Sequence, residues 1–203
     1  GLIDRDAERD WLRSHLREGR QLLVLYGRRR VGKTTLVTNV LDEIDVPSVY
    51  FLCDQRGTAH NARTFAARLA AALDDVEPAV DGFDGAFRYL VTRVDGPFVV
   101  ALDEFSYLVE EDERVPSDFQ GIVDEVLDDT EVSLVLLGSS ISMMEEGVLS
   151  YESPLYGRRT GQWRLEPLTV GDAGGFLPSY DPTELVRAYS VVGGIPAYLE
   201  QFT

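Results

Sequence analysis

The residue types with the clearest chemical potential stand together in one short segment, Gly27-Arg28-Arg29-Arg30-Val31-Gly32-Lys33-Thr34. It fits the pattern G-x-x-x-x-G-K-[ST], whose glycines let the backbone turn tightly and bring successive N–H groups toward an anion. The Lys33 ammonium supplies a point charge for the β- and γ-phosphates of a nucleotide, and the Thr34 hydroxyl is a ligand for Mg²⁺. We therefore predict that a nucleotide is bound by a phosphate loop comprising Gly27, Arg28, Arg29, Arg30, Val31, Gly32, Lys33, Thr34 and Thr35.

Two acids, Asp103 and Glu104, directly follow a nearly continuous apolar run that begins at Phe98. Such a run is typical of a buried strand in a parallel sheet, and the carboxyl ends of these strands share an edge with the phosphate loop. There we expect Asp103 to hold Mg²⁺ through the water shell of the ion, while Glu104 polarises an attacking water. The alternative interpretation is that the two acids form a solvated turn.

Three further side chains are candidates for contact with the terminal phosphate. Ser139 ends another apolar segment, where its hydroxyl is placed to bond the γ-phosphate or the attacking water, or alternatively local backbone. Arg158 and Arg159 stand in a loop-like segment, and a guanidinium at the phosphate edge stabilises charge on the transferring group. The alternative for both arginines is a structural or solvated position. The predicted catalytic residues are thus Glu104, Lys33, Ser139, Arg158 and Arg159.

The charge of the chain limits its partners. Acidic residues number 35 and basic residues 19, giving a net charge of −16, and Lys33 is the only lysine. This balance lacks the broad basic footprint of a nucleic-acid-binding surface, although the run Arg28-Arg29-Arg30 leaves such contact as an alternative. A surface this acidic repels itself at low salt and is screened at molar salt, so we predict a halophilic protein; the alternative is an acidic protein without salt adaptation.

Five apolar segments alternate with predicted helices along the chain. Strands are predicted at Gln21–Tyr26, Pro47–Leu52, Phe98–Glu104, Val132–Leu137 and Gln162–Leu165. The first strand runs into the phosphate loop, and a helix over Thr34–Leu41 leaves it. Strands that alternate with helices indicate an α/β fold with a parallel sheet and right-handed crossovers.

Several local features refine this picture. The first helix is expected to be capped near Asp4 or Asp6, and Asn61 is a candidate cap for the helix Ala62–Leu73. Cys53 is the only cysteine; we expect it to be buried, and its isolation suits a reducing, cytoplasmic location. Apolar runs all fall short of the roughly 18 residues that span a bilayer, so we expect no membrane association.

Taken together, the motifs resemble those of the archaeal ATPase family, a branch of the signal-transduction ATPases with numerous domains (STAND). This branch falls in the additional-strand, catalytic-glutamate class. The resemblance spans about Ile3 to Leu199 and rests on five motifs: Gly27 to Thr34, Leu102-Asp103-Glu104-Phe105, Gly138-Ser139-Ser140, Ser153-Pro154-Leu155-Tyr156-Gly157-Arg158-Arg159-Thr160 and Gly193-Gly194-Ile195-Pro196-Ala197-Tyr198-Leu199.

This resemblance implies a P-loop NTPase fold of three α/β/α layers with a five-stranded sheet in the order 2-3-4-1-5, followed by a helical segment. It also implies that Ile3-Asp4-Arg5 lies near the adenine, that Ser139 acts as a sensor, and that Gly194 and Pro196 form a Gly-x-Pro signature. Relatives usually continue into a winged-helix or other C-terminal domain. We accordingly expect an ATPase core over residues 1–168 and the start of a helical subdomain over 169–203, in the amino-terminal part of a longer protein.

The predicted function is Mg²⁺-dependent binding and hydrolysis of ATP as a regulatory switch for a C-terminal effector or a protein partner, with oligomerisation left open. A nucleotide-binding scaffold that does not hydrolyse ATP is one alternative. A DNA-associated ATPase similar to replication initiators is another, and a small-molecule kinase is a further one by analogy of fold.

Overall fold

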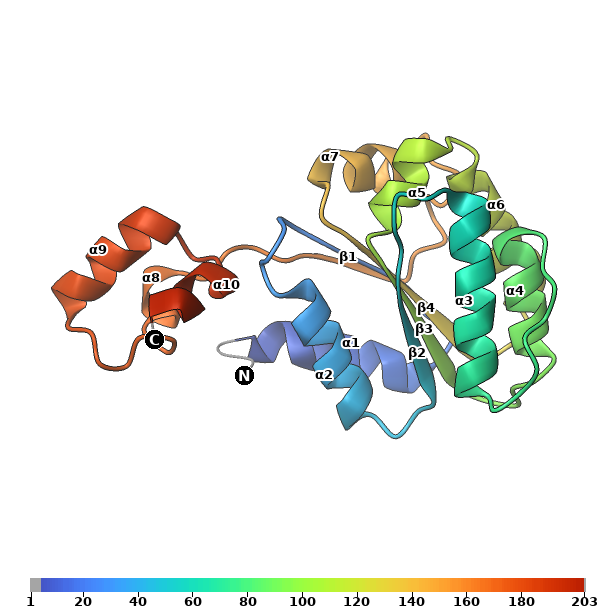
Figure 1. Ribbon diagram of the computed structural model, residues 1–203, viewed down its shortest axis with the longest axis horizontal. Coiled ribbons are helices and arrows are strands. Elements are labelled where there is room, and N and C mark those ends of the chain that lie inside the picture. The colour runs from blue at the N-terminus through green and yellow to red at the C-terminus, as the bar shows by residue number, and fades with distance from the viewer. Residues whose placement is uncertain (1–4, 203) are drawn as a thin grey trace.

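A single parallel sheet organises the protein, whose computed structural model describes residues 5–202 (Figure 1). The sheet has five strands in the order β2-β3-β4-β1-β5, which confirms the predicted fold and strand order. The strands are β1 (Leu22–Tyr26), β2 (Ser48–Leu52), β3 (Phe98–Asp103), β4 (Val132–Gly138) and β5 (Gly161–Arg164).

Burial follows the position of each strand in the sheet. Every residue of β1, β3 and β4 is buried, as expected for inner strands covered on both faces, whereas the edge strands β2 and β5 are only partly buried. The register pairs Tyr26 with Gly138 and Leu52 with Asp103. The carboxyl ends of β1, β3 and β4 therefore meet at one edge of the sheet.

Helices cover both faces of the sheet (Figure 1). On one face α1 and α2 pack on alternate residues of the inner strands, such as Leu23, Ala101 and Val135. The other face is covered by α3, α4, α5 and α6, where Phe65, Phe87 and other aromatic rings contact one another. The helices of the core are α1 (Asp6–Glu18), α2 (Lys33–Glu43), α3 (Thr58–Ala72), α4 (Gly82–Val91), α5 (Phe105–Glu111), α6 (Val115–Gly121) and α7 (Ile141–Met144), with π-helical turns η1 (Ile122–Val126) and η2 (Glu145–Leu149).

The residues that follow β5 form a helical segment beside the carboxyl edge of the sheet (Figure 1). It contains α8 (Val170–Ala173), α9 (Pro182–Val192), α10 (Pro196–Leu199) and the 3₁₀ turn η3 (Glu200–Phe202). These helices bury an apolar cluster of their own, made of Leu168, Ala173, Phe176, Leu177, Ala188 and Leu199. At Gly194 an added Cβ would lie 1.7 Å from the Leu168 carbonyl oxygen, so only glycine allows the two backbone segments to approach. The predicted subdomain boundary at residue 168 stays a prediction.

Two predicted helix caps differ from the structure. Asn61 lies one turn inside α3, because the helix already begins at Thr58. Its side chain instead bonds the backbone of Asp54 and Gly57 and fixes the loop before the helix. At α1 the N-cap residue is Arg5, with Asp6 as the first helical residue, and the alternative cap Asp4 lies outside the described residues. Within residues 5–202, none of the helices has both the length and the apolar character needed to cross a membrane.

Candidate functional site

The phosphate loop connects the end of β1 to the start of α2. Gly27 has φ 150°, and a Cβ there would lie 2.3 Å from the Leu165 carbonyl oxygen, so the loop packs against the backbone that follows β5. Gly32 has φ 104° and directly precedes Lys33, the first residue of α2. Arg30 also adopts a positive φ, 63°. This backbone places the amino end of a helix at the loop, an arrangement that attracts anions.

The Lys33 side chain is buried against the backbone of the phosphate loop. Its Nζ donates to the carbonyl oxygens of Gly27 at 2.7 Å and Arg28 at 2.9 Å. Burial lowers the pKa of the Lys33 ammonium, while the carboxylates of Glu104 and Asp103 act in the opposite direction. The ammonium is thus held inside the loop at the position where phosphate oxygens are expected.

The Asp103 carboxylate is the centre of a small hydrogen-bonded group. Its Oδ2 accepts from the hydroxyls of Thr34 and Tyr50, each at 2.6 Å, and its Oδ1 accepts from the Glu104 backbone N–H at 2.8 Å. Asp103 is 2% exposed. Carboxylate and hydroxyl oxygens are ligands that Mg²⁺ prefers, so the two predicted metal-binding residues, Thr34 and Asp103, are brought together with suitable chemistry.

Glu104 stands next to this group in a strained conformation. Its backbone lies in the left-handed region, with φ 55° and ψ 37°, immediately before α5. Ser139 Oγ donates to Glu104 Oε1 at 2.8 Å, whereas Glu104 Oε2 is buried without a hydrogen-bond partner among residues 5–202. A non-glycine residue held in this region costs of order 1–3 kcal/mol, and such strain gathers at functional sites.

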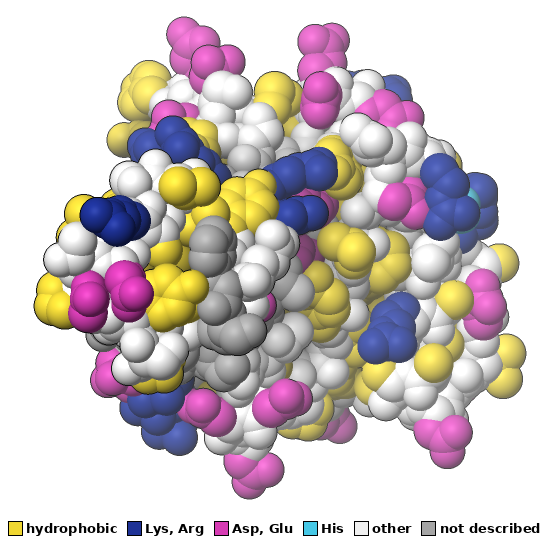
Figure 2. Space-filling view, turned by 60° about the vertical axis from the view of Figure 1, so that its left-hand side comes forward, with side chains coloured by type: hydrophobic (Ala, Val, Ile, Leu, Met, Phe, Trp, Pro, Cys, Tyr) yellow, Lys and Arg dark blue, Asp and Glu magenta, His cyan; other side chains and the backbone are white. Residues whose placement is uncertain are grey.

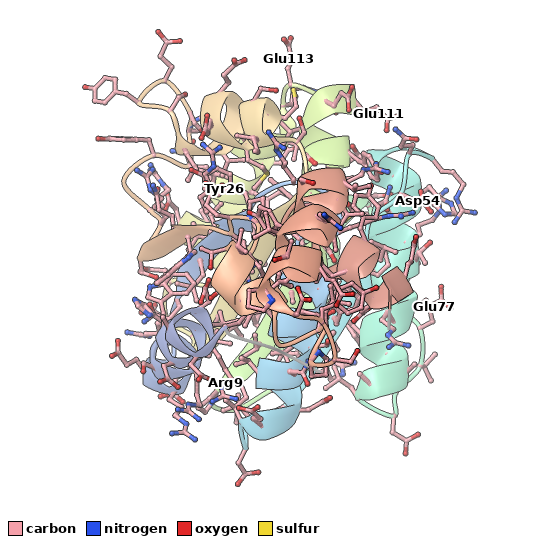
Figure 3. The ribbon with its side chains drawn as sticks, turned by 90° about the vertical axis from the view of Figure 1, so that its left-hand side faces the viewer. Arg9, Tyr26, Asp54, Glu77, Glu111 and Glu113 are labelled. Carbon is pink, nitrogen blue, oxygen red and sulfur yellow. The ribbon has the colours of Figure 1, made fainter. Side chains whose placement is uncertain are left out.

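Lys33, Thr34, Glu104 and Ser139 line one cleft, which has a volume of about 330 Å³. The cleft is lined by Arg29, Arg30, Gly32, Lys33, Thr34, Thr35, Glu104, Ser139, Pro196, Ala197 and Glu200. Figure 2 shows basic side chains at this boundary between the C-terminal helices and the core. Figure 3 looks onto the same side, where the C-terminal helices lie in front of the sheet between Tyr26, at the end of β1, and Asp54, after β2.

Arginines of the phosphate loop contact both sides of the cleft. Arg29 bonds the Tyr107 hydroxyl on α5, and its guanidinium lies 5.7 Å from the centroid of that ring. The Arg30 guanidinium lies 5.5 Å from the centroid of the Tyr198 ring on α10. The loop is therefore linked to the core on one side and to the C-terminal helices on the other.

Arg158 and Arg159 do not join this cleft, in contrast to the expectation for their loop. Arg158 forms a two-pronged ion pair with Asp124, with its Nη2 at 2.7 Å, and Arg159 donates to the Leu149 carbonyl oxygen at 3.2 Å. The loop enters β5 beside the first residue of β1, Leu22, where Thr160 N donates to its carbonyl oxygen. At about 3.3 Å per residue, β1 separates this end from the phosphate loop by roughly 13 Å. Within one chain, Arg158 and Arg159 thus lie near the amino ends of the strands, whereas the phosphate loop lies at their carboxyl ends.

The segment expected near the adenine is described only in part, since Ile3 and Asp4 lie outside the described residues. Arg5 is 8% exposed and bonds the carbonyl oxygens of Val31, in the phosphate loop, and Glu166, after β5. It therefore connects the amino-terminal segment to the loop.

Two parts of the site escape prediction from the sequence. Tyr50 contacts Asp103 only through the register of β2 on β3, which no local motif encodes. The contribution of Pro196, Ala197 and Glu200 to the cleft depends on how the C-terminal helices fold back. The Gly-Ile-Pro motif at residue 194 was the one available signal for it.

Solved structures of archaeal proteins share this fold. The Walker-type ATPase PABY2304 of Pyrococcus abyssi superposes with a TM-score of 0.69 at 22% identity, over 98% of this chain and 65% of that one. The Aeropyrum pernix ORC1 protein, solved in complex with DNA, gives a TM-score of 0.73 at 17% identity, over 100% of this chain and 59% of that one. At these identities the likeness establishes the fold alone.

Two sequence relatives match this chain, one over nearly all of it and one over less than a third. A Methanocaldococcus jannaschii protein named uncharacterized protein MJECL04 is 36% identical over 201 residues, which cover 98% of this chain and 44% of the relative. A second protein of that organism, MJ0424, is 47% identical over 60 residues, or 29% of this chain and 58% of its own length. The chain thus spans less than half the length of MJECL04. Residues 2–202 match the family described as an ATPase domain predominantly from Archaea, and this chain belongs to that family.

Proposed function

We propose that this chain binds ATP with Mg²⁺ and hydrolyses it, and that the state of the nucleotide acts as a regulatory switch for a C-terminal effector or a protein partner. The observation that carries the proposal is the cleft itself. It combines the buried Lys33 ammonium, the Thr34–Asp103 pair at 2.6 Å and a Glu104 carboxylate oxygen without a partner among the described residues. Family membership and the fold support nucleotide binding.

The residues of the cleft divide the chemistry between them. The phosphate loop and Lys33 bind and orient the phosphates, and Thr34 with Asp103 would hold Mg²⁺. Bound Mg²⁺ supplies positive charge that offsets the charge developing on the phosphate oxygens. The Glu104 carboxylate orients a water and accepts its proton, while the hydrogen bond from Ser139 to Oε1 holds the carboxylate in place.

The proposed switch rests on the composition of the cleft walls. One wall is formed by the core and the other by Pro196, Ala197 and Glu200 of the C-terminal helices. Arg30 of the phosphate loop also contacts Tyr198 in α10. A ligand in the cleft touches both parts, so loss of the γ-phosphate changes the contacts that hold the helices against the core. Assignment to the STAND branch belongs to this proposal and rests on the sequence motifs.

Two alternative functions, a scaffold without hydrolysis and a DNA-associated ATPase, require different features of the chain. A scaffold without hydrolysis has no use for a strained glutamate with a buried, unpaired carboxylate oxygen beside the metal-binding pair, which favours the ATPase. A DNA-associated function is favoured by the likeness to the ORC1 protein solved with DNA, but a chain of net charge −16 needs basic surface from elsewhere to bind DNA.

The decisive experiment measures binding of a fluorescent ATP analogue and release of phosphate by the purified chain in molar KCl with Mg²⁺. We expect Mg²⁺-dependent binding and slow phosphate release, both abolished by Lys33→Ala. The control is Arg63→Ala, an exposed substitution on α3 outside the cleft. Absence of Mg²⁺-nucleotide affinity in the unmodified chain, or a Lys33→Ala variant that behaves like it, contradicts the proposal.

A further inference from the structure

We propose that Tyr50 is a positioning residue for the metal site, because its hydroxyl fixes the Asp103 carboxylate in the orientation that receives Mg²⁺. This inference rests on the proposed function, since it assigns Tyr50 to the same cleft. Tyr50 stands in β2, outside the motifs that define the phosphate loop and the two acids.

Strand register brings the two side chains together. In the parallel pairing of β2 with β3, Tyr50 is opposite Ala101 and Leu52 is opposite Asp103. Tyr50 and Asp103 are therefore diagonal neighbours on one face of the sheet, and the long Tyr50 side chain places its hydroxyl 2.6 Å from Asp103 Oδ2. The small Ala101 side chain leaves room for the Tyr50 ring, which also packs against the cluster beneath α1 and α2.

The hydrogen bonds leave the carboxylate little freedom to rotate. Oδ2 accepts from Tyr50 and Thr34, each at 2.6 Å, and Oδ1 accepts from the Glu104 N–H at 2.8 Å. The Thr34 hydroxyl is itself a predicted Mg²⁺ ligand, so its bond to Asp103 changes when the ion binds. Tyr50 is then the side-chain donor that stays on Oδ2 in both states and keeps the carboxylate plane fixed.

The chemistry of Tyr50 suits a permanent donor. A tyrosine hydroxyl carries one O–H donor, and Tyr50 directs it to Asp103 Oδ2 at 2.6 Å. Partners that orient metal ligands in this way typically change metal affinity by about 10–100-fold when removed.

An experiment can distinguish whether Tyr50 only packs in the core or also orients the Asp103 carboxylate. The ring packs on apolar side chains, whereas only the hydroxyl reaches Asp103. Tyr50→Phe keeps the ring and removes the hydroxyl, so it tests the hydrogen bond with little change in packing. The matched control is Tyr89→Phe, because the Tyr89 hydroxyl also donates to an aspartate, Asp75, at 3.0 Å but lies on the exposed surface of α4.

The experiment titrates Mg²⁺ at a fixed concentration of a fluorescent, non-hydrolysable ATP analogue, and repeats nucleotide binding in EDTA. For Tyr50→Phe we expect the half-saturating Mg²⁺ concentration to rise about 10-fold, with nucleotide affinity in EDTA unchanged. Tyr89→Phe should match the unmodified chain in both titrations. A thermal melt of each variant verifies that it is folded.

The other possible results of these titrations contradict either the positioning role of Tyr50 or the proposed function. If Tyr50→Phe needs no more Mg²⁺ than the unmodified chain, the positioning role is overturned while the proposed function stands. Equal loss of affinity with and without Mg²⁺ overturns it too, since Tyr50 would then support the general shape of the cleft. If Tyr89→Phe shows the same shift, the effect is not specific to Asp103. Failure of the proposed function itself appears separately, as a lack of Mg²⁺-dependent binding by the unmodified chain.

Discussion

Ser139 Oγ donates a hydrogen bond to Glu104 Oε1 at 2.8 Å, and so joins the carboxyl end of β4 to the residue that follows β3. The bond occupies one carboxylate oxygen and leaves Oε2 buried with no partner in the described part of the chain. From sequence, Ser139 was expected to contact the γ-phosphate or the attacking water. In the structure Ser139 lines the cleft and holds one oxygen of the predicted catalytic base, so its contact with a bound phosphate or water stays a prediction.

Replacement of Glu104 by glutamine should separate binding from hydrolysis. The amide has nearly the same shape and can still accept from Ser139, but it cannot take a proton from water. We expect Glu104→Gln to retain Mg²⁺-dependent binding of ATP and to release phosphate about 10²–10⁴-fold more slowly. Parallel measurements of analogue binding and phosphate release check this, and unchanged hydrolysis would remove Glu104 from the mechanism.

Replacement of Ser139 by alanine should impair turnover through the orientation of Glu104. A hydrogen bond to a charged group contributes about 1.5–3 kcal/mol, so its loss should slow turnover by roughly 10–100-fold. We expect ATP affinity to be unchanged, since the bond is to Glu104 and not to the phosphate loop. The control Ser142→Ala changes an exposed serine of α7. A selective loss of ATP affinity in Ser139→Ala would instead favour direct contact with the nucleotide.

Arg158→Ala should leave the ATP turnover of the isolated chain unchanged. Its guanidinium pairs with Asp124 in η1, at the end of the sheet opposite the phosphate loop. We expect only a small decrease in melting temperature, since ion pairs this exposed contribute little. Turnover measured across protein concentrations provides the control, because a defect that grows with concentration would show Arg158 acting on a neighbouring copy. A defect in the dilute chain would contradict the placement.

The local sequence was sufficient to predict those parts of the site whose residues lie on one continuous segment. The glycine and lysine spacing of residues 27–34 defines a loop backbone, and an apolar run that ends in Asp103 and Glu104 defines a strand end. Both depend on short-range chemistry. The sheet order was also predicted, but through resemblance to a family and not through the chain's own periodicity.

Contacts between distant segments could not be predicted in the same way. The Tyr50–Asp103 bond requires the register of two strands that are 53 residues apart in sequence. Arg158 directly precedes β5, and a segment that enters a parallel strand lies at its amino end, so the direction of β5 and not the loop composition decides the position of Arg158. The prediction of Asn61 as a cap rests on its residue type before an alanine-rich segment, and it is wrong because α3 begins three residues earlier, at Thr58.

Cys53 should resist thiol reagents in the folded protein and react quickly when it unfolds. It is 1% exposed, and its N–H donates to the Asp103 carbonyl oxygen. Burial raises the pKa of the Cys53 thiol well above the usual 9.0, and the nearby carboxylates of Asp103, Asp54 and Glu104 add to this. A disulfide reagent at pH 8 should therefore label the native chain far more slowly than the denatured chain; rapid native labelling would contradict this burial.

The Cys53 thiol should also make the free energy of unfolding decrease at alkaline pH. The pKa is higher in the folded state, so the unfolded chain loses its proton first. Stabilisation from the protonated thiol is therefore complete below the usual pKa of 9.0 and is lost as the pH rises above it. Denaturant titrations at pH 8 and pH 10 should show this decrease, and Cys53→Ala should reduce it. A pH dependence that is identical in Cys53→Ala would assign the decrease to other groups.

Stability should increase from low salt to molar KCl. Two effects oppose each other, because salt weakens surface ion pairs such as Arg93–Asp75 and also screens repulsion among the acids. Exposed pairs contribute only about 0–1 kcal/mol each, whereas repulsion acts throughout a chain with 35 acidic and 19 basic residues. At 1 M salt the Debye length is about 3 Å, so the repulsion is largely removed and the melting temperature should rise. Asp128→Asn with Asp129→Asn, two exposed positions, should raise the melting temperature at low salt and flatten its dependence on KCl. A melting temperature that is constant from low to molar KCl would show that acidic repulsion does not limit the stability of this fold.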